Sequence, residues 1–567
     1  MVPSSNLNFG DGGSARRPVN RRPRRRAPPL PSAPAFGHTR ARMSKRFYLT
    51  TAIDYVNGQP HLGHAYEKVI TDVIARAHRA LGEPVFFLTG LDEHGQKVQQ
   101  AAAAEGKTPQ AYCDELSEVW IAFARKLNLT NDDFVRTTRP RHYQVVQGLL
   151  TRLHADGHFY KATYKGFYSA REETFLTDKD RQPDGSWDPA YGEVVELAED
   201  NWYFRLQHQQ GWLIEYIERN PEFIQPDYRR NEVLGFLRNN ALEDLCITRP
   251  KARLSWGIPL PFDHDYVTYV WFDALVNYIS IPAAHGDPVA LGAMADTNSK
   301  LKTQNSKLEL WPADLHVIGK DILKFHAVYW PIMLRAMNLP LPRQILAHGW
   351  WQKDGAKISK STGNVVDPLA VIDEWGLDAF RFYVVRELDI GPDGNWTDAG
   401  FRARYAAELA NGLGNLVNRS LSMLKRYRNG VVPARHDELA PDAGKARHET
   451  IEHLRRAELQ SALGSIWSLV TRANQYVDQT APFKLARDLE QAHRLDAVLY
   501  NLAETCRVLA VLLWPFLPET SAKIFAQLNL PGEPDKLAAA HWGGLPAGHQ
   551  IGEPSALFPR KDLPPKS

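Results

Sequence analysis

Two short polar motifs in this sequence contain residue types that can stabilise the charge of a polyphosphate. The first, His61-Leu62-Gly63-His64, lies between an apolar segment and a periodic one. At the start of a helix, unpaired N–H groups and the positive end of the dipole favour phosphate, and glycine lets a flat ring approach the backbone. Two imidazoles can also donate hydrogen bonds to charge that grows in a transition state. Taken alone, the motif is also compatible with polar caps at the start of a helix.

The second motif is Lys357-Ile358-Ser359-Lys360-Ser361. Asp354-Gly355 before it and Thr362-Gly363-Asn364 after it predict a mobile loop, which can bring ammonium groups onto a polyphosphate. Lysines and serines in a loop are often merely solvated, so this motif alone is ambiguous. The two motifs stand at opposite ends of one predicted α/β region, and together they favour a shared role in phosphate chemistry.

The segments around the first motif predict a strand–helix–strand unit. Residues 47–53 are β-branched and aromatic, which is typical of a strand, and apolar residues then recur at helical spacing from Val69 to Leu81. A second strand is predicted at Val85–Gly90, before Leu91-Asp92-Glu93-His94-Gly95. In a βαβ unit ligands bind at the carboxyl ends of the strands, where both the His61–His64 motif and Leu91–Gly95 lie.

The rest of the chain predicts a divided α/β domain followed by helices. Residues 159–245 are aromatic and irregular and are interpreted as an insertion. A second α/β section contains Tyr266–Asp273, Leu315–Gly319 and a helix from Asp321 to Met337. From Thr397 onward the pattern is almost wholly helical. One apolar face of this region contains Phe401, Tyr405, Leu409, Leu413, Leu416 and Leu424.

Composition excludes several classes of protein. The 567 residues are 44% hydrophobic and 23% charged, values typical of a soluble protein with a large core. The longest uncharged apolar run, Val508–Leu517, contains Pro515 and is about half as long as a membrane span. Three cysteines with no Cys-x-x-Cys pair exclude a disulfide scaffold and the common thiolate zinc sites, and indicate a reducing compartment.

The N-terminal segment differs from the rest of the chain in charge. Residues 1–42 hold nine Arg, seven Pro, no Lys and one acid, Asp11, so we expect this segment to be disordered. It has three competing interpretations: an upstream-start artefact with Met43 opening the chain, a basic tail that touches RNA, or an organellar transit peptide. Without it, 59 basic and 64 acidic side chains give a net charge of −5. Nucleic-acid contacts must therefore come from local patches.

The two motifs resemble the HIGH and KMSKS signatures of class I aminoacyl-tRNA synthetases, with Leu62 for Ile and Ile358 for Met. Further stretches are similar to the methionyl-tRNA synthetases: Ala52–Asn57, Leu91–Gly95, Tyr269–Leu275, Ile318–Asp321 and Ala473–Asp478. The resemblance covers about residue 45 to the low 540s. It implies an α/β fold: a split Rossmann-type parallel-sheet catalytic domain with an insertion, followed by an all-α helical bundle.

The resemblance also implies a domain plan and a reaction. The expected units are a disordered basic segment at 1–42, catalytic halves at 43–158 and 246–345, a connective insertion at 159–245, a KMSKS loop and stem-contact region at 346–396, an anticodon-binding bundle at 397–545 and a tail at 546–567. The implied enzyme is a methionine–tRNA ligase. It activates methionine with ATP, accompanied by Mg²⁺, to methionyl-adenylate and transfers methionine to the 3′ end of tRNA(Met), including initiator tRNA.

Three sets of site residues follow from the resemblance. ATP binding is implied for His61, Gly63, His64, Lys357, Ser359, Lys360 and Ser361, of which His61, His64, Lys357 and Lys360 are the catalytic candidates. The methionine pocket is implied for Ile53, Tyr55, Asp92, Trp271, Leu275, Tyr278 and His326. Asp92 would hold the substrate ammonium, and Tyr278 could offer the thioether a weak hydrogen bond. Anticodon contacts are implied for Asn415, Arg419 and Phe483.

Plainer alternatives remain for these residues. Trp271 and Tyr278 could be core packing, and Asp92 an exposed acid at a strand end. Asn415 and Arg419 are spaced i, i+4 beside the apolar stripe, so we expect both to reach solvent, as ordinary surface residues also would. Two positions depart from the family: Leu275 replaces a Pro of some relatives, and Phe483 replaces the usual Trp.

The remaining expectations concern metal, assembly and rival functions. The insertion contains no Cys and only one His, His208, so it resembles the zinc-free, short-insertion branch and no protein-bound zinc is expected. No C-terminal β-barrel domain is recognisable, which favours a monomer; we expect a cytoplasmic protein with no membrane contact. Synthetases for other aliphatic amino acids carry a larger editing insertion than 159–245. A catalytically dead tRNA-binding or scaffold protein is disfavoured by the two intact motifs.

Overall fold

The computed structural model describes residues 46–169, 174–176, 180–286, 310–357 and 365–561. The basic segment at 1–42 lies outside this part of the chain, as do Ser359, Lys360 and Ser361 of the second motif.

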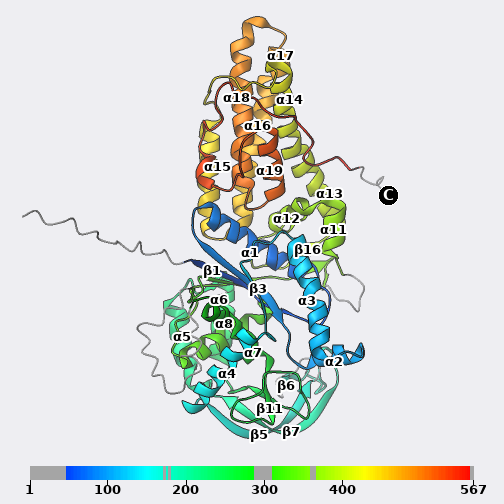
Figure 1. The fold of residues 1–567 in the computed structure, drawn as a ribbon, viewed down its shortest axis with the longest axis vertical. Coiled ribbons are helices and arrows are strands. Elements are labelled where there is room, and N and C mark those ends of the chain that lie inside the picture. The colour runs from blue at the N-terminus through cyan, green and yellow to red at the C-terminus, as the bar shows by residue number, and fades with distance from the viewer. Residues whose placement is uncertain (1–45, 170–173, 177–179, 287–309, 358–364, 562–567) are drawn as a thin grey trace, which may run out of the picture. The chain divides into compact units, whose positions relative to one another are not determined.

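The centre of the part of the chain that precedes the bundle is a parallel sheet of seven strands (Figure 1). Its order is β2-β3-β1-β12-β13-β8, with β4 also paired to β3. The strands are β1 Phe47–Thr51, β2 Asp54–Tyr55, β3 Val85–Asp92, β4 Asp133–Arg136, β8 Ile224–Gln225, β12 Leu315–Gly319 and β13 Ile345–His348. The pairs whose register is resolved are parallel, for example Leu49 opposite both Phe87 and Leu315.

Alternate side chains of the central strands enter two different cores. Tyr48 and Phe86 pack on one face with the insertion and the helices that follow it, whereas Leu49 and Phe87 pack on the other face. This second core is continuous with the interior of the helical bundle. A strand buried on both faces shows a continuous apolar run, which is why residues 47–53 and 85–90 were recognisable as strands.

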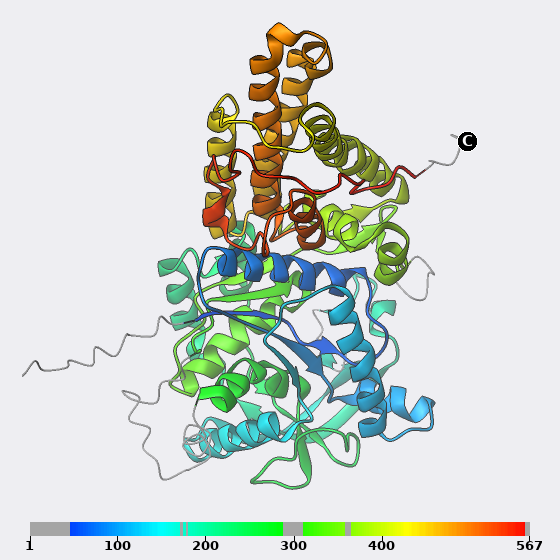
Figure 2. The same cartoon turned by 45° about the horizontal axis from the view of Figure 1, so that its top comes forward.

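Helix α1 (Leu62–Ala80) lies between the sheet and the bundle. Figure 2 shows it as the blue helix that crosses below the orange helices. It packs on β1 and β3 on one side and on α12 (Leu377–Arg386) and α15 (Ala440–Arg455) on the other, so nearly all of its residues are buried. Gly82, with φ +87°, takes the left-handed conformation just after its end. Helices α2 (Gln96–Ala104), α3 (Pro109–Lys126) and α4 (Pro140–Ala155) follow β3 and β4.

The insertion is a regular antiparallel sheet, so the prediction of an irregular segment at 159–245 was wrong. Its order is β6-β5-β7-β9, from Thr174–Leu176, Phe159–Ser169, Val194–Phe204 and Leu245–Cys246. The alternation of polar and apolar residues that is typical of a strand is absent here, because aromatic side chains occupy both faces of the sheet. Cross-strand pairs of them stack, such as Tyr160 and Tyr203 with ring centroids 5.7 Å apart. Helices α5 (Gln210–Arg219) and α6 (Asp227–Asn239) flank β8, which already pairs with β13 in the main sheet.

The second α/β section also differs from its predicted form. Tyr266–Thr268 forms β11, which pairs with β10 (Thr248–Pro250) outside the main sheet, and the chain then turns into α7 (Val270–Leu275) and α8 (Asn277–Gly286). The helix predicted from Asp321 to Met337 consists of a 3₁₀ turn at Lys320–Ile322, a π-helix at Phe325–Tyr329 and α10 (Trp330–Ala336). A small sheet of β14 (Trp351–Lys353), β15 (Ala356–Lys357) and β16 (Gly394–Trp396) surrounds the start of the second motif.

The C-terminal part is a helical bundle. After α11 (Pro368–Trp375) it contains α13 (Asp398–Arg404), a π-helix at Tyr405–Gly414, α14 (Asn415–Arg428), α16 (Leu459–Thr480), α17 (Pro482–Leu485), α18 (Ala492–Leu513) and α19 (Pro518–Gln527), besides α12 and α15. All six residues of the predicted apolar stripe are buried. No helix in the described part of the chain is long and apolar enough to span a membrane.

Candidate active site

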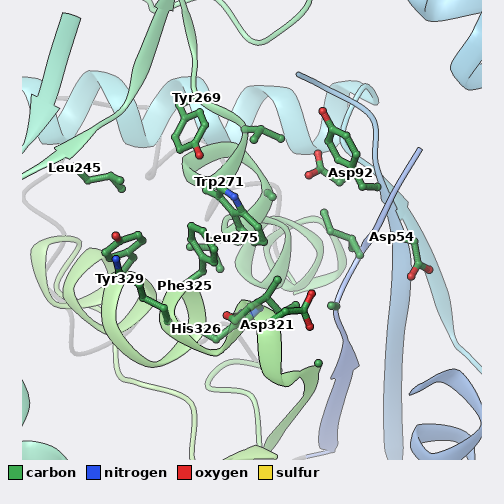
Figure 3. A pocket seen from close by; sticks show the side chains of 18 of the residues that line it. Asp54, Asp92, Leu245, Tyr269, Trp271, Leu275, Asp321, Phe325, His326 and Tyr329 are labelled. Carbon is green, nitrogen blue, oxygen red and sulfur yellow. Dashed lines mark hydrogen bonds between the residues drawn. The ribbon is translucent and has the colours of Figure 1, made fainter. Parts of the chain in front are cut away.

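A cavity of about 1190 Å³ lies at the carboxyl ends of the central strands (Figure 3). It is lined by the β1–α1 connection, the end of β3, α7 and α8, the segment after β12, the segment after β13 and parts of the insertion. Every described residue that was predicted to bind ATP or the amino acid lines this cavity through its side chain or backbone, except Lys357. The fold therefore brings together residues that are more than 270 positions apart in sequence, such as Ile53 and His326.

The two histidines of the first motif cap helix α1. His61 Nδ1 accepts a hydrogen bond from the Gly63 backbone at 3.1 Å, and His64 Nδ1 accepts one from the His61 backbone at 3.1 Å. The rings stack with centroids 3.7 Å apart. Because both Nδ1 atoms accept, the proton of each neutral ring lies on Nε2. The interpretation of the motif as a helix cap is therefore confirmed, because the Nδ1 atoms cap α1. The phosphate role of the Nε2 atoms stays a prediction.

The apolar side of the cavity is neutral and aromatic. Trp271 stacks on Phe325 with ring centroids 3.7 Å apart. The Tyr278 hydroxyl and His326 Nε2 are 2.8 Å apart, and His326 Nδ1 contacts the Ile322 carbonyl at 3.0 Å. Burial lowers the pKa of His326 to about 4 and raises the pKa of Tyr278. Both side chains are therefore neutral at physiological pH.

These contacts correct one expectation about Tyr278. A carbonyl only accepts, so the His326 proton lies on Nδ1, and Nε2 must accept the hydroxyl proton of Tyr278. The hydroxyl of Tyr278 is thus committed to His326 and has no second proton for a sulfur atom. Ile53, Tyr55 and Leu275 complete the lining of this region, and Asp92 at the end of β3 also faces the cavity (Figure 3).

A buried ionic network at the wall of the cavity was not predicted, and three of its members, Asp54, Glu67 and His348, line the cavity. Lys68 Nζ lies 3.0 Å from Asp54 Oδ2 and 2.9 Å from Glu67 Oε1, and Glu67 Oε2 lies 3.2 Å from His348 Nε2. Burial raises the pKa of Asp54 to about 7, against the opposing charge of Lys68. Two signals pointed to this network: Glu67 follows His64 by three residues on one helix face, and His348 ends a parallel strand.

The second motif begins at the edge of the cavity. Trp351 and Gln352 line the cavity, and the backbone of Gln352 in β14 pairs with that of Lys357 in β15. The side chain of Lys357 and the whole of Ser359, Lys360 and Ser361 lie outside the described residues.

The residues predicted to contact the anticodon lie in the bundle and not at the cavity. Asn415, the first residue of α14, is half-buried, and Arg419 lies 3.6 Å from Asp478 Oδ1 near the end of α16. Phe483, on α17 just beyond that end, is 45% exposed, although most large apolar side chains of the bundle are buried. An exposed aromatic ring is suited to stacking on an unpaired base.

No group of three or more His, Cys, Asp or Glu side chains that could hold a metal ion occurs within the described residues.

Two known families match the sequence. The family of class I tRNA synthetases (M) matches residues 47–196 and 189–421, and the anticodon binding domain of methionyl tRNA ligase matches residues 429–562. The methionine–tRNA ligase of Clostridium tetani is 40% identical over 530 residues, which cover 92% of this chain and 79% of the relative. That of Listeria monocytogenes is 39% identical over 540 residues, covering 91% and 78%.

Solved structures give the same result. The Mycobacterium tuberculosis methionyl-tRNA synthetase in complex with methionyl-adenylate is 37% identical, with a TM-score of 0.81, over 91% of this chain and 100% of that chain. The apo form from the same organism is 34% identical, with a TM-score of 0.78, over 92% and 99%.

Proposed function

The chain belongs to the methionyl-tRNA synthetase family, which activates methionine with ATP and transfers it to tRNA, and we propose that both steps take place in the cavity at the carboxyl ends of the sheet. The observation that supports this location is the pair of stacked histidines at the N-terminus of α1, on the wall of that cavity.

In the first step, a methionine carboxylate oxygen attacks the α-phosphorus of ATP in line. A bond forms between that oxygen and phosphorus while the bond to the leaving pyrophosphate breaks, so no covalent enzyme nucleophile is needed. His61 and His64 donate from Nε2 to the α-phosphate region, where charge changes in the transition state. Lys357 and Lys360 neutralise the pyrophosphate, with Ser359 and Ser361 beside them. Mg²⁺ enters with ATP and is not a resident metal.

The methionine side chain occupies the neutral aromatic part of the cavity. Trp271 and the Tyr278–His326 pair offer polarisable faces to a thioether, and Ile53 and Leu275 complete an apolar wall. Tyr55 also lines this part of the cavity. Asp92, at the end of β3, pairs with the substrate ammonium. An apolar wall with the Asp92 carboxylate near it matches the two ends of methionine.

The helical bundle supplies tRNA selection. We assign anticodon contacts to Asn415, Arg419 and Phe483, for both elongator and initiator tRNA(Met), because base stacking and edge contacts suit an unpaired loop. We assign this role to the predicted bundle unit at 397–545 and the chemistry to the units at 43–158 and 246–345. The protein acts as a cytoplasmic monomer without resident zinc.

Pyrophosphate exchange with each of the twenty amino acids tests the reaction and its substrate. Methionine should stimulate exchange strongly, and leucine and isoleucine hardly at all. Trp271→Ala should raise the methionine KM, because the pocket loses its largest wall. Equal stimulation by leucine would contradict the methionine assignment of the pocket.

A further inference from the structure

A buried carboxylate, Asp273, lies behind the proposed methionine pocket. It links helix α7 to the segment that follows Asp92. Asp273 lies on α7 between Trp271 and Leu275, which both line the cavity. Its Oδ2 is 2.6 Å from Nδ1 of His94, and its Oδ1 is 2.6 Å from Nε2 of His142. Asp273 is 1% exposed. None of these three side chains lines the cavity, so none of them can contact a substrate there.

The carboxylate is ionised and accepts from both rings. Burial by itself raises the pKa of an aspartate, but the adjacent His94 and His142 lower the pKa of Asp273 to about 2. A carboxylate only accepts, so the protons lie on Nδ1 of His94 and Nε2 of His142. Nδ1 of His142 lies 2.9 Å from Ser280 Oγ on α8, which fixes that ring as well. Hydrogen bonds to an ionised group are stronger and shorter than neutral ones.

His94 connects the Asp273 carboxylate to the end of β3, where Asp92 lies. The residue between them, Glu93, is anchored to β4: its backbone N–H donates to Thr137 Oγ1 at 2.9 Å, and Arg136 Nε donates to its carboxylate at 2.6 Å. The segment that follows Asp92 is therefore held on one side by the sheet. On the other side the His94–Asp273 hydrogen bond ties it directly to α7.

We propose that Asp273 is a positioning residue that sets the spacing of the amino-acid pocket. Through His94 it fixes Asp92, which binds the ammonium, relative to Trp271 and Leu275, which contact the side chain. This inference rests on the methionine pocket assigned above. Groups that must meet both ends of one small substrate need a rigid separation, since a misplacement of about 1 Å is enough to weaken the fit. Loosening this link should therefore impair methionine and not ATP.

Steady-state pyrophosphate exchange with Asp273→Asn tests the proposal. The amide has one accepting oxygen and no charge, so only one histidine can keep donating to it and neither hydrogen bond is charge-assisted. We expect the methionine KM to rise about tenfold or more, the scale of one charge-assisted hydrogen bond, while the ATP KM changes less than about twofold. The preference for methionine over ethionine, which is one methylene longer, should fall.

Two variants of His94 separate positioning from mere folding. His94→Ala should reproduce the methionine defect. His94→Asn places an amide N–H near the former Nδ1 and should restore most of the methionine KM. These variants also keep the test open if Asp273→Asn does not fold. If His94→Asn behaves like His94→Ala, the hydrogen bond to Asp273 does not set the pocket.

Asp378→Asn is the matched control, because Asp378 is another buried carboxyl but lies between α12 and α19 and not behind the cavity. It should alter thermal stability and leave the ratio of the two KM values unchanged. Equal shifts of both KM values in Asp273→Asn would overturn the positioning role.

Asp92→Asn, assayed in parallel, tests the pocket itself: an unchanged methionine KM in that variant would overturn the pocket assignment. An unchanged methionine KM in Asp273→Asn alone would overturn only the inference about Asp273.

Discussion

At the scale of single residues, hydrogen bonding determines which ring nitrogen of a histidine carries the proton. His61 and His64 use Nδ1 to cap α1, and His326 uses both ring nitrogens inside the protein. Histidines in this protein thus have different roles. His61 and His64 can donate from Nε2 to a phosphate, whereas His326 forms part of the neutral lining of the proposed methionine pocket.

Removal of one phosphate-facing imidazole should affect the reaction and not methionine binding. His64→Ala should lower kcat of adenylate formation about a hundredfold or more, as the loss of one oxyanion donor does. Lys360→Ala should have an effect of similar size. Single-turnover adenylate formation measures the rate, and equilibrium dialysis measures the methionine Kd, which should change little. Loss of methionine affinity with an unchanged kcat would contradict the assigned role.

At the scale of secondary-structure elements, local patterns were sufficient for part of the fold. The apolar runs of β1 and β3 and the periodic face of α1 were readable because neighbouring residues in sequence determine them. The π-helices at Phe325–Tyr329 and Tyr405–Gly414 were not, since the extra residue in a turn leaves no clear mark on the period. The Lys68 network was also missed, because Asp54 and His348 join it only after the sheet has formed.

The residues of the candidate site likewise fall into those that the sequence could predict and those that it could not. The first motif and the end of β3 were predictable because parallel strands place their carboxyl ends together. Asp273, two residues from Trp271, could not be recognised from sequence as a link. Its partners His94 and His142 come from other elements, and nothing in the spacing of the three residues indicates that they meet.

Asp378 links two elements and should make stability depend on pH. Its Oδ2 accepts from the Thr520 backbone in the first turn of α19 at 2.6 Å. Burial raises the pKa of Asp378 from 3.8 to about 6, against the hydrogen bonds from Thr520. The folded protein thus holds this proton more tightly than the unfolded chain. The stabilisation is complete below about pH 3.8 and is lost as the pH rises through about 6.

Asp378→Asn stays neutral and should escape this loss. Relative to wild type, its free energy of unfolding should rise by about 2 kcal/mol between about pH 4.5 and about pH 7.5. Urea unfolding at several pH values measures the difference. A difference that does not change with pH would show that Asp378 is ionised in the folded protein throughout this range.

Loss of the residues assigned to the anticodon should affect charging and not activation. Asn415→Ala, Arg419→Ala and Phe483→Ala should each weaken aminoacylation of tRNA with the CAU anticodon by about 1–3 kcal/mol, the scale of a good base contact. Phe483→Trp should be tolerated, since a larger ring stacks at least as well. Pyrophosphate exchange without tRNA is the internal control and should be unchanged. Equal charging of a transcript with one altered anticodon base would contradict all three assignments.

At the scale of the whole molecule, a single guanidinium ties the catalytic half to the bundle. Arg381 on α12 is fully buried and lies 2.9 Å from Asp72 on α1, the helix whose first turn carries His61 and His64. Its Nε donates to the Phe516 carbonyl at 2.9 Å, and its Nη2 to the Pro515 carbonyl at 3.1 Å. These two carbonyls lie in the connection between α18 and α19. The Arg381 side chain thus joins α1 to the connection between α18 and α19.

Loss of this guanidinium should cost far more than loss of an ordinary ion pair. In Arg381→Gln, the buried carboxylate of Asp72 keeps Arg76 but loses its second cation. The carbonyls of Phe516, Pro515 and Leu127 also lose the guanidinium as their donor. Breaking a buried pair typically costs about 3–5 kcal/mol, because the remaining charge is uncompensated.

Arg386→Gln is the matched control on the same helix. Arg386 pairs with Glu408 at 3.0 Å in a partly exposed position, where an ion pair contributes about 0–1 kcal/mol. We therefore expect urea unfolding to show a much larger loss of stability for Arg381→Gln than for Arg386→Gln. Equal losses in the two variants would mean that the junction is held by apolar packing around α1 and not by Arg381.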